Sequence, residues 1–430
     1  MDKSRQRQSG AATARSRPPC AGLFFHAALL LLLPGWTPAS AQERFKPAEA
    51  AVVLSASVHS GAGRLAPLRA IDKAWRAQPR DLETSLAYAR AVFTLGLNEG
   101  DLRWYGSAKA ALTPWWSAED LPAEAYFLRG LVKQGFHEFE AGLQDINRAI
   151  ALAPGRTELW SWRFALHLLL ADMDAARQVV EEMTRRFGAQ EAQVYRAVLL
   201  YRTGQPWPAV DLLSRAIRAE NFQDASSQDW LSFHLGEAHR VAGQPEQALA
   251  AWSRRLKASP QSHLIRLSLA ELLNQQGQYR QAKNTATANT ASGATTAASS
   301  PMTDALLMQA LLASRGLKDA DETRWASQLE ARFQSQAQRQ ESLIERPKLI
   351  YQIAYGRDLK AGLALSMANW QLQKEPPDAL LFVQAALALG QARAAEPVVL
   401  WAEKTGYTDP QLTPLLARLQ SHPSWTGGRP

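Results

Sequence analysis

The chain has 430 residues, of which 46% are hydrophobic and 20% are charged, and its formal net charge is +8. It is too apolar to be wholly disordered and longer than one compact core usually holds, so several domains or an elongated repeat array are expected. Half of the net charge comes from the first 41 residues, and the rest of the chain has no basic stripe interleaved with aromatic residues. These features argue against nucleic acid as a partner.

The first 41 residues have the three-part pattern of a secretory signal peptide. Basic residues precede an apolar run from Leu23 to Leu33, a Pro-Gly pair breaks the run, and the small residues Ala-Ser-Ala follow at 39–41. The run is shorter than the roughly 20 residues that span a bilayer. We expect cleavage before Gln42, export to the periplasm of a Gram-negative cell or secretion, and no stable membrane insertion afterwards. An uncleaved N-terminal anchor is the alternative.

From Gln42 onward nearly every segment has the periodicity of an amphipathic helix, and no stretch alternates as a strand does. Residues 123–154 and 229–260 align without a gap. The matching positions are Gly130, Gly142 and Pro154 in the first segment and Gly236, Ala248 and Pro260 in the second. Small residues let two helices cross closely, and a proline ends the second helix. The pattern therefore predicts stacked helix hairpins.

This register resembles the tetratricopeptide repeat (TPR) family, with Tyr126 and Trp160 in its first aromatic position. The clearest repeats cover residues 123–282. The resemblance implies an all-α solenoid of helical hairpins wound into a right-handed superhelix.

Composition divides the helical part of the chain into two arrays. Residues 42–283 form an N-terminal TPR-like array, and residues 302–421 form a C-terminal array of looser helical hairpins. Between them, residues 284–301 are Ala, Thr and Ser with almost nothing large to bury, so a flexible linker is expected. A poorly packed Ala-rich helix is the alternative. Residues 422–430 are interpreted as a tail.

The sequence offers no signal for catalysis, a cofactor or a metal. Nucleophile elbows, zinc-protease motifs and phosphate-binding loops are missing from it. His234 and His239 are five positions apart and do not share a helix face. The only cysteine, Cys20, would be removed with the signal peptide. We therefore expect no enzyme; a cell-wall-directed enzyme whose acids come from distant hairpins is the alternative.

Four large aromatic residues lie within residues 100–116. Their helical spacing up to Pro114 favours packing between hairpins over an aromatic ligand cage. Trp115 and Trp116 follow that proline directly, and two adjacent indole rings are hard to bury together. One of them is a possible exposed contact site.

The family resemblance also implies a function. In TPR proteins the first helices of successive hairpins line a concave groove that grips peptides or protein segments. Carried over by position, the groove candidates here are Phe127, Gln134, Tyr195, Arg202, Trp230, Phe233, Glu237, Arg240, Glu271 and Asn274. The resemblance, together with the signal-peptide pattern, thus implies an exported, non-enzymatic scaffold or adaptor for a protein or peptide partner. The alternative is a membrane-associated assembly factor retained by an uncleaved anchor.

Overall fold

The computed structural model describes residues 29–30, 66–101, 103–288, 302–338, 343–344 and 346–425. Most of the predicted signal peptide, residues 289–301 of the predicted linker and residues 426–430 of the predicted tail lie outside this part. Within the described residues, no helix combines the length and the apolar character needed to cross a membrane.

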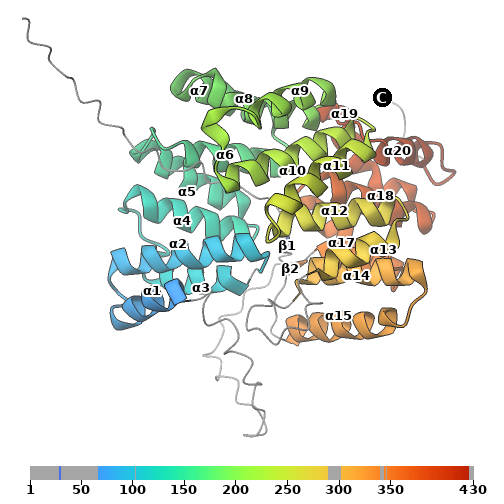
Figure 1. The fold of residues 1–430 in the computed structure, drawn as a ribbon, viewed down its shortest axis with the longest axis horizontal. Helices are drawn as coiled ribbons and strands as arrows, with labels where there is room; N and C mark the ends of the chain where they lie inside the picture. Colours follow the sequence, from blue (N-terminus) through green and yellow to red (C-terminus); the bar gives the residue numbers. More distant parts are fainter. Residues whose placement is uncertain are drawn as a thin grey trace, which may run out of the picture.

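The described part is built almost entirely of helices (Figure 1). Its first half contains α1 (Ala66–Ala77), α2 (Leu82–Glu99), α3 (Arg103–Leu112), η2 (Thr113–Trp115), α4 (Ala123–Gly135), α5 (Phe139–Leu152), α6 (Thr157–Leu169), α7 (Met173–Phe187), α8 (Ala189–Arg202), α9 (Pro206–Ala216) and η3 (Glu220–Phe222). Its second half contains α10 (Ala225–Val241), α11 (Pro245–Ala258), α12 (His263–Gln275), α13 (Tyr279–Thr287), α14 (Asp304–Leu317), α15 (Asp321–Gln338), α16 (Arg346–Ile353), α17 (Leu359–Leu372), α18 (Pro376–Ala388), η4 (Ala392–Ala395), α19 (Glu396–Thr405) and α20 (Leu412–Gln420). Two short strands, β1 (Leu29–Leu30) and β2 (Leu343–Ile344), pair antiparallel.

Consecutive helices pack as hairpins, and successive hairpins stack on one another. The predicted all-α, TPR-like solenoid is confirmed. Close crossing depends on small residues, as the register predicted: a Cβ atom on Gly130 would lie 2.9 Å from the carbonyl oxygen of Gly142. The aromatic position is also repeated, because the Tyr126 hydroxyl and the Trp160 indole each donate to a carbonyl oxygen in the preceding loop, those of Glu119 and Pro154.

Each turn between the two helices of a hairpin contains a residue with positive φ, from α2–α3 to the turn after α18. At six of these turns the residue is a glycine: Gly100, Gly204, Gly243, Gly277, Gly356 and Gly390. Three others are not glycine: His137 (φ 61°), Ala171 (φ 57°) and Lys318 (φ 55°). A left-handed residue lets the chain reverse directly after a helix, so the turns share one geometry.

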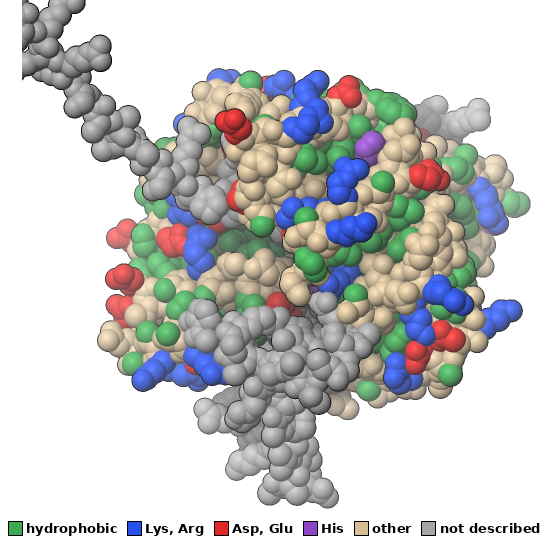
Figure 2. Space-filling model, viewed as in Figure 1, with side chains coloured by type: hydrophobic (Ala, Val, Ile, Leu, Met, Phe, Trp, Pro, Cys, Tyr) green, Lys and Arg blue, Asp and Glu red, His purple; other side chains and the backbone are tan. Residues whose placement is uncertain are grey.

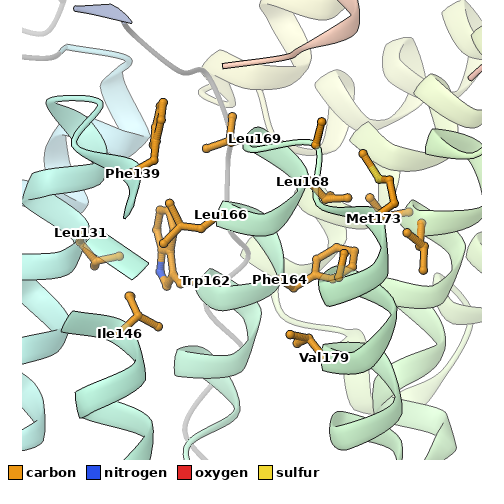
Figure 3. Close-up of a cluster of buried hydrophobic side chains, with 14 of the residues drawn as sticks. Leu131, Phe139, Ile146, Trp162, Phe164, Leu166, Leu168, Leu169, Met173 and Val179 are labelled. Carbon is orange, nitrogen blue, oxygen red and sulfur yellow. The ribbon is translucent and has the colours of Figure 1, made fainter. Parts of the chain in front are cut away.

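The core runs between the layers of the stacked hairpins (Figure 3). Trp162 and Phe164 are buried on opposite sides of α6: the indole faces Leu131 and Ile146 of the preceding hairpin, and the phenyl ring faces Val179 of α7. Each layer is therefore held by the next, as expected for a solenoid.

Helical packing continues on both sides of the predicted linker. Helix α13 extends to Thr287, into the range predicted to be flexible, and packs against α14 beyond it. The ring of Tyr279 occupies the space beside Gly316, where a Cβ atom would overlap it. The two arrays are thus neighbouring parts of one stack.

Candidate functional site

Three charged groove candidates, Arg202, Glu237 and Arg240, lie near the ends of α8 and α10, where loops from the C-terminal hairpins meet them. The Arg202 guanidinium donates to both carboxylate oxygens of Glu375, at 2.9 and 3.4 Å. The Arg240 guanidinium donates to Asp409 at 2.5 Å and to Glu237 at 3.0 Å. Arg202 is only 8% exposed and Asp409 only 6%. Both arginines are therefore occupied by carboxylates of the same chain.

Asp409 also organises the loop that carries it. Its carboxylate accepts hydrogen bonds from the backbone N–H groups of Gln411 (2.8 Å) and Leu412 (3.0 Å) and from the Tyr407 hydroxyl (3.1 Å). Burial alone would raise the pKa of Asp409, but the Arg240 guanidinium and these N–H groups outweigh it and hold the pKa below its ordinary value. The carboxylate is therefore ionised while it lies against Arg240.

Further contacts join the ends of neighbouring first helices to the loops that carry Glu375 and Asp409. The N–H of Lys374 donates to the carbonyl oxygen of Leu169, the last residue of α6, at 3.0 Å. Further along, Gly204 lies so close to the carbonyl oxygen of Gly406 that no side chain would fit between them. At the end of α12, Gln275 accepts a hydrogen bond from Gln411 at 2.9 Å.

We call this set of contacts the closing seam. It joins the C-terminal ends of α6, α8, α10 and α12 to two loops of the C-terminal hairpins, residues 373–375 and 406–411.

The polar candidates on α12 face the next first helix, α14. Asn274 donates to the backbone oxygen of Gln309 at 2.9 Å and to its side-chain oxygen at 3.0 Å, and Gln309 reaches Glu271 at 3.5 Å. Burial raises the pKa of Glu271 to about 7, although the nearby Arg346 guanidinium opposes that rise. Glu271 is thus a carboxyl group that takes up a proton near neutral pH.

The aromatic candidates divide into two groups. Tyr195, Trp230 and Phe233 lie on α8 and α10, and the rings of Tyr195 and Trp230 are 5.6 Å apart. Phe127 is fully buried on α4, and Gln134 is buried on the same helix. The structure therefore brings the α8 and α10 rings together, while the α4 candidates belong to the packing of an earlier hairpin.

A charged network near Phe127 was missed by sequence reasoning. Arg90 binds Glu124 (2.6 Å) and Glu158 (3.1 Å), and Arg156 binds the same two carboxylates at 2.9 Å each. Arg90 and Glu124 are 34 residues apart, so the repeat period itself was the signal that could have revealed the network. All its charges are paired, so it is best understood as a bond between successive hairpins.

The Pro-Trp-Trp stretch is fixed by a buried arginine that was also missed. Arg129 donates to the backbone oxygens of Trp115 (3.0 Å), Trp116 (3.0 Å) and Ala118 (2.9 Å) and is paired with Asp145. Both indole rings are half-buried against the core. The Lys109 ammonium group lies 5.0 Å from the Trp116 ring, which leaves this ring partly covered.

The described residues contain no cluster of three or more His, Cys, Asp or Glu side chains with the geometry of a metal site. On the face shown in Figure 2, acidic and basic side chains are interspersed over the described part of the surface.

At the level of sequence, neither protein-family models nor curated proteins match this chain. Solved structures do. A crystal structure of the APC/C hetero-tetramer Cut9–Hcn1 is similar over 85% of this chain and 76% of that chain, with 12% identity and a TM-score of 0.50. The chain has a TPR-like fold.

Two other similar structures have lower scores. PilW, a type IV pilus biogenesis factor, covers 49% of this TPR-like chain and 93% of its own, with 16% identity and a TM-score of 0.38. The human IFIT1 dimer with m7Gppp-AAAA covers 86% and 88%, with 12% identity and a TM-score of 0.37. At these identities the likeness concerns the fold alone.

Proposed function

We propose that this protein is an exported, non-enzymatic TPR-like scaffold that holds a segment of a partner protein against α8, α10 and α12. The observation that carries the proposal is the occupancy of Arg202 and Arg240, each of which binds a carboxylate from a loop far away in the sequence. The ends of these helices thus have the donors needed to hold an irregular segment of chain.

The neighbouring side chains suit the same task. The half-buried Tyr195 lies against the buried Trp230, and the half-buried Phe233 is one helical turn further along α10. Aromatic and arginine side chains contribute most of the energy at protein interfaces, because they bury a large area and orient several hydrogen bonds.

Export is supported by the N-terminal charged, apolar and small-residue pattern. An intact-mass spectrum of the protein purified from its native cells tests it. A mass equal to that of the chain starting at Gln42 would support export with cleavage. A mass that includes residues 1–41 would favour the membrane-retained assembly factor instead.

The binding face can be tested by photocrosslinking in living cells. A photoreactive amino acid is placed at Gln275, an exposed position at the end of α12, or at Arg254, an exposed position on the second helix α11. We expect a discrete adduct with another protein from position 275 and none from position 254. Adducts from position 254 alone, or from neither position, would contradict the proposed face.

A further inference from the structure

The groups that should hold a partner are already bound by the chain's own C-terminal hairpins. We propose that the closing seam is an autoinhibitory clasp, in which Glu375 and Asp409 occupy the arginines that a partner would use. The partner then carries an acidic segment, and it binds by replacing these two carboxylates. This inference rests on the proposed function for the identity of the face, and it adds the partner's chemistry and its control.

The clasp is built twice in the same way. Arg202 is the last residue of α8, and Arg240 lies in the last turn of α10. Each is met by an acidic residue from a loop: Glu375 precedes α18, and Asp409 lies between α19 and α20. All four side chains are largely shielded, with exposures between 6% and 16%. Two equivalent donors at consecutive first helices therefore bind two equivalent acceptors.

The seam joins loops and helix ends. Besides the two ion pairs, the described residues show one backbone hydrogen bond, from Lys374 to Leu169, the close approach of Gly204 and Gly406, and the pair Gln275–Gln411. Buried apolar residues of α16 to α20 also belong to the same core cluster as those of α2 to α10. Opening is therefore local: the two loops can separate from the helix ends while this core stays buried, because the helices keep their own neighbours.

The charge of a partner segment determines whether it can replace Glu375 and Asp409. Opening without a substitute leaves Arg202 without a carboxylate and Arg240 with Glu237 alone, both in a shielded place, which is unfavourable. A partner segment with its own carboxylates exchanges one ion pair for another, so most of that cost disappears. A neutral segment offers no such exchange. The acidic partner is therefore favoured by the same desolvation that keeps the free protein closed.

Opening can be measured with one pair of cysteines. In the full chain with Cys20→Ser, the variants Gln275→Cys and Gln411→Cys place two thiols where the glutamine side chains now touch. Dibromobimane becomes fluorescent only when it bridges both thiols, so the rate of bridging reports the closed state. The clasp is then broken by Arg202→Gln with Arg240→Gln, which leaves the loop that carries residue 411 unaltered. The matched control removes two arginines of surface ion pairs, Arg177→Gln with Arg393→Gln.

We expect bridging to slow about tenfold in the clasp variant and to stay unchanged in the control, with native helicity in both. If the folded clasp variant bridges at the original rate, the clasp is overturned. If that variant fails to fold, the rate of bridging is measured in the two-cysteine protein with both ion pairs intact, in the presence of a peptide. The probe is a peptide with the sequence of residues 405–413 and blocked termini, in which Asp409 is the only charged side chain, and its control has Asn in place of Asp.

The acidic peptide should slow bridging at millimolar concentration and the Asn peptide should not; equal effects, or none from either, would overturn an acidic partner. These measurements need no natural partner. Failure of the photocrosslinking experiment with normal bridging results would therefore refute the proposed function and leave the clasp standing, whereas the reverse pattern would refute the clasp alone.

Discussion

Gly236 of α10 and Trp252 of α11 are in direct contact, and the indole ring lies where a Cβ atom of residue 236 would be. Trp252 is 1% exposed, and its indole N–H donates to the backbone oxygen of Phe233 at 3.2 Å. The absence of a side chain at position 236 therefore makes room for a whole indole ring.

Replacement of this glycine should be costly. Gly236→Ala forces Trp252 out of its position, and we expect the free energy of unfolding to fall by about 1–3 kcal/mol, the usual cost of overpacking. Urea denaturation measures it. The control is Gly106→Ala in α3, where nothing lies within 4 Å of the new Cβ, so helix propensity should raise stability by up to about 1 kcal/mol. Equal effects of the two substitutions would contradict the crossing geometry.

The buried arginine beneath the Pro-Trp-Trp stretch should be one of the most sensitive charges in the N-terminal array. Arg129→Met leaves Asp145 with Lys133 as its only cationic partner and frees three backbone oxygens. We expect a loss of about 3–5 kcal/mol in chemical denaturation. Arg177→Met breaks an exposed ion pair with Asp174 and should cost less than about 0.5 kcal/mol. A small effect at position 129 would show that the loop does not depend on it.

The left-handed turns predict opposite outcomes for two exchanges. Lys318 has φ 55° after α14, so Lys318→Gly should stabilise the protein by about 0.5–1 kcal/mol because glycine adopts this conformation without strain. Gly356 has φ 76° and open space around it, so Gly356→Ala should destabilise by about 1 kcal/mol through backbone strain alone. Thermal unfolding of both variants checks the signs; a stabilising alanine at 356 would be incompatible with the turn.

Stability should depend on pH through Glu271. Its pKa of about 7 in the folded protein lies above its ordinary value, because it is buried. Between the two values the folded protein holds a proton that the unfolded chain releases, so the free energy of unfolding falls as pH rises through this range. Glu271→Gln removes this dependence. We expect the variant to be more stable than the original by about 2–3 kcal/mol at pH 8, with the two converging near pH 4. Parallel curves for the two proteins would refute this assignment.

The hairpins could be predicted from the sequence because their determinants are local. Gly130 and Gly142 mark a crossing, and Pro154 follows the end of α5 closely, so a pattern within one repeat specifies the contact. The aromatic position was found in the same way. The left-handed turns were within reach too, since several of them are glycines at the same place in the repeat, but His137 and Ala171 hide that pattern.

The closing seam could not be predicted in this way. Arg202 and Glu375 are 173 residues apart, and no period relates them. Their meeting depends on the small rotation between each hairpin and the next, summed over the whole stack. The total rotation depends on side-chain packing in every layer, and the periodicity of the sequence does not specify that packing. For the same reason the sequence could not show which side chains contact the groove candidates.

Contacts within hairpins and contacts in the closing seam differ in sequence separation, and this difference implies an order in which they form during folding. Hairpin contacts join residues close in sequence and can form as each repeat emerges, whereas the Arg240–Asp409 contact spans 169 residues. Local contacts form early and long loops close late. A chain that folds from its N-terminus therefore has complete repeats with uncovered arginines until its last hairpins arrive, and closure is the final step of its maturation.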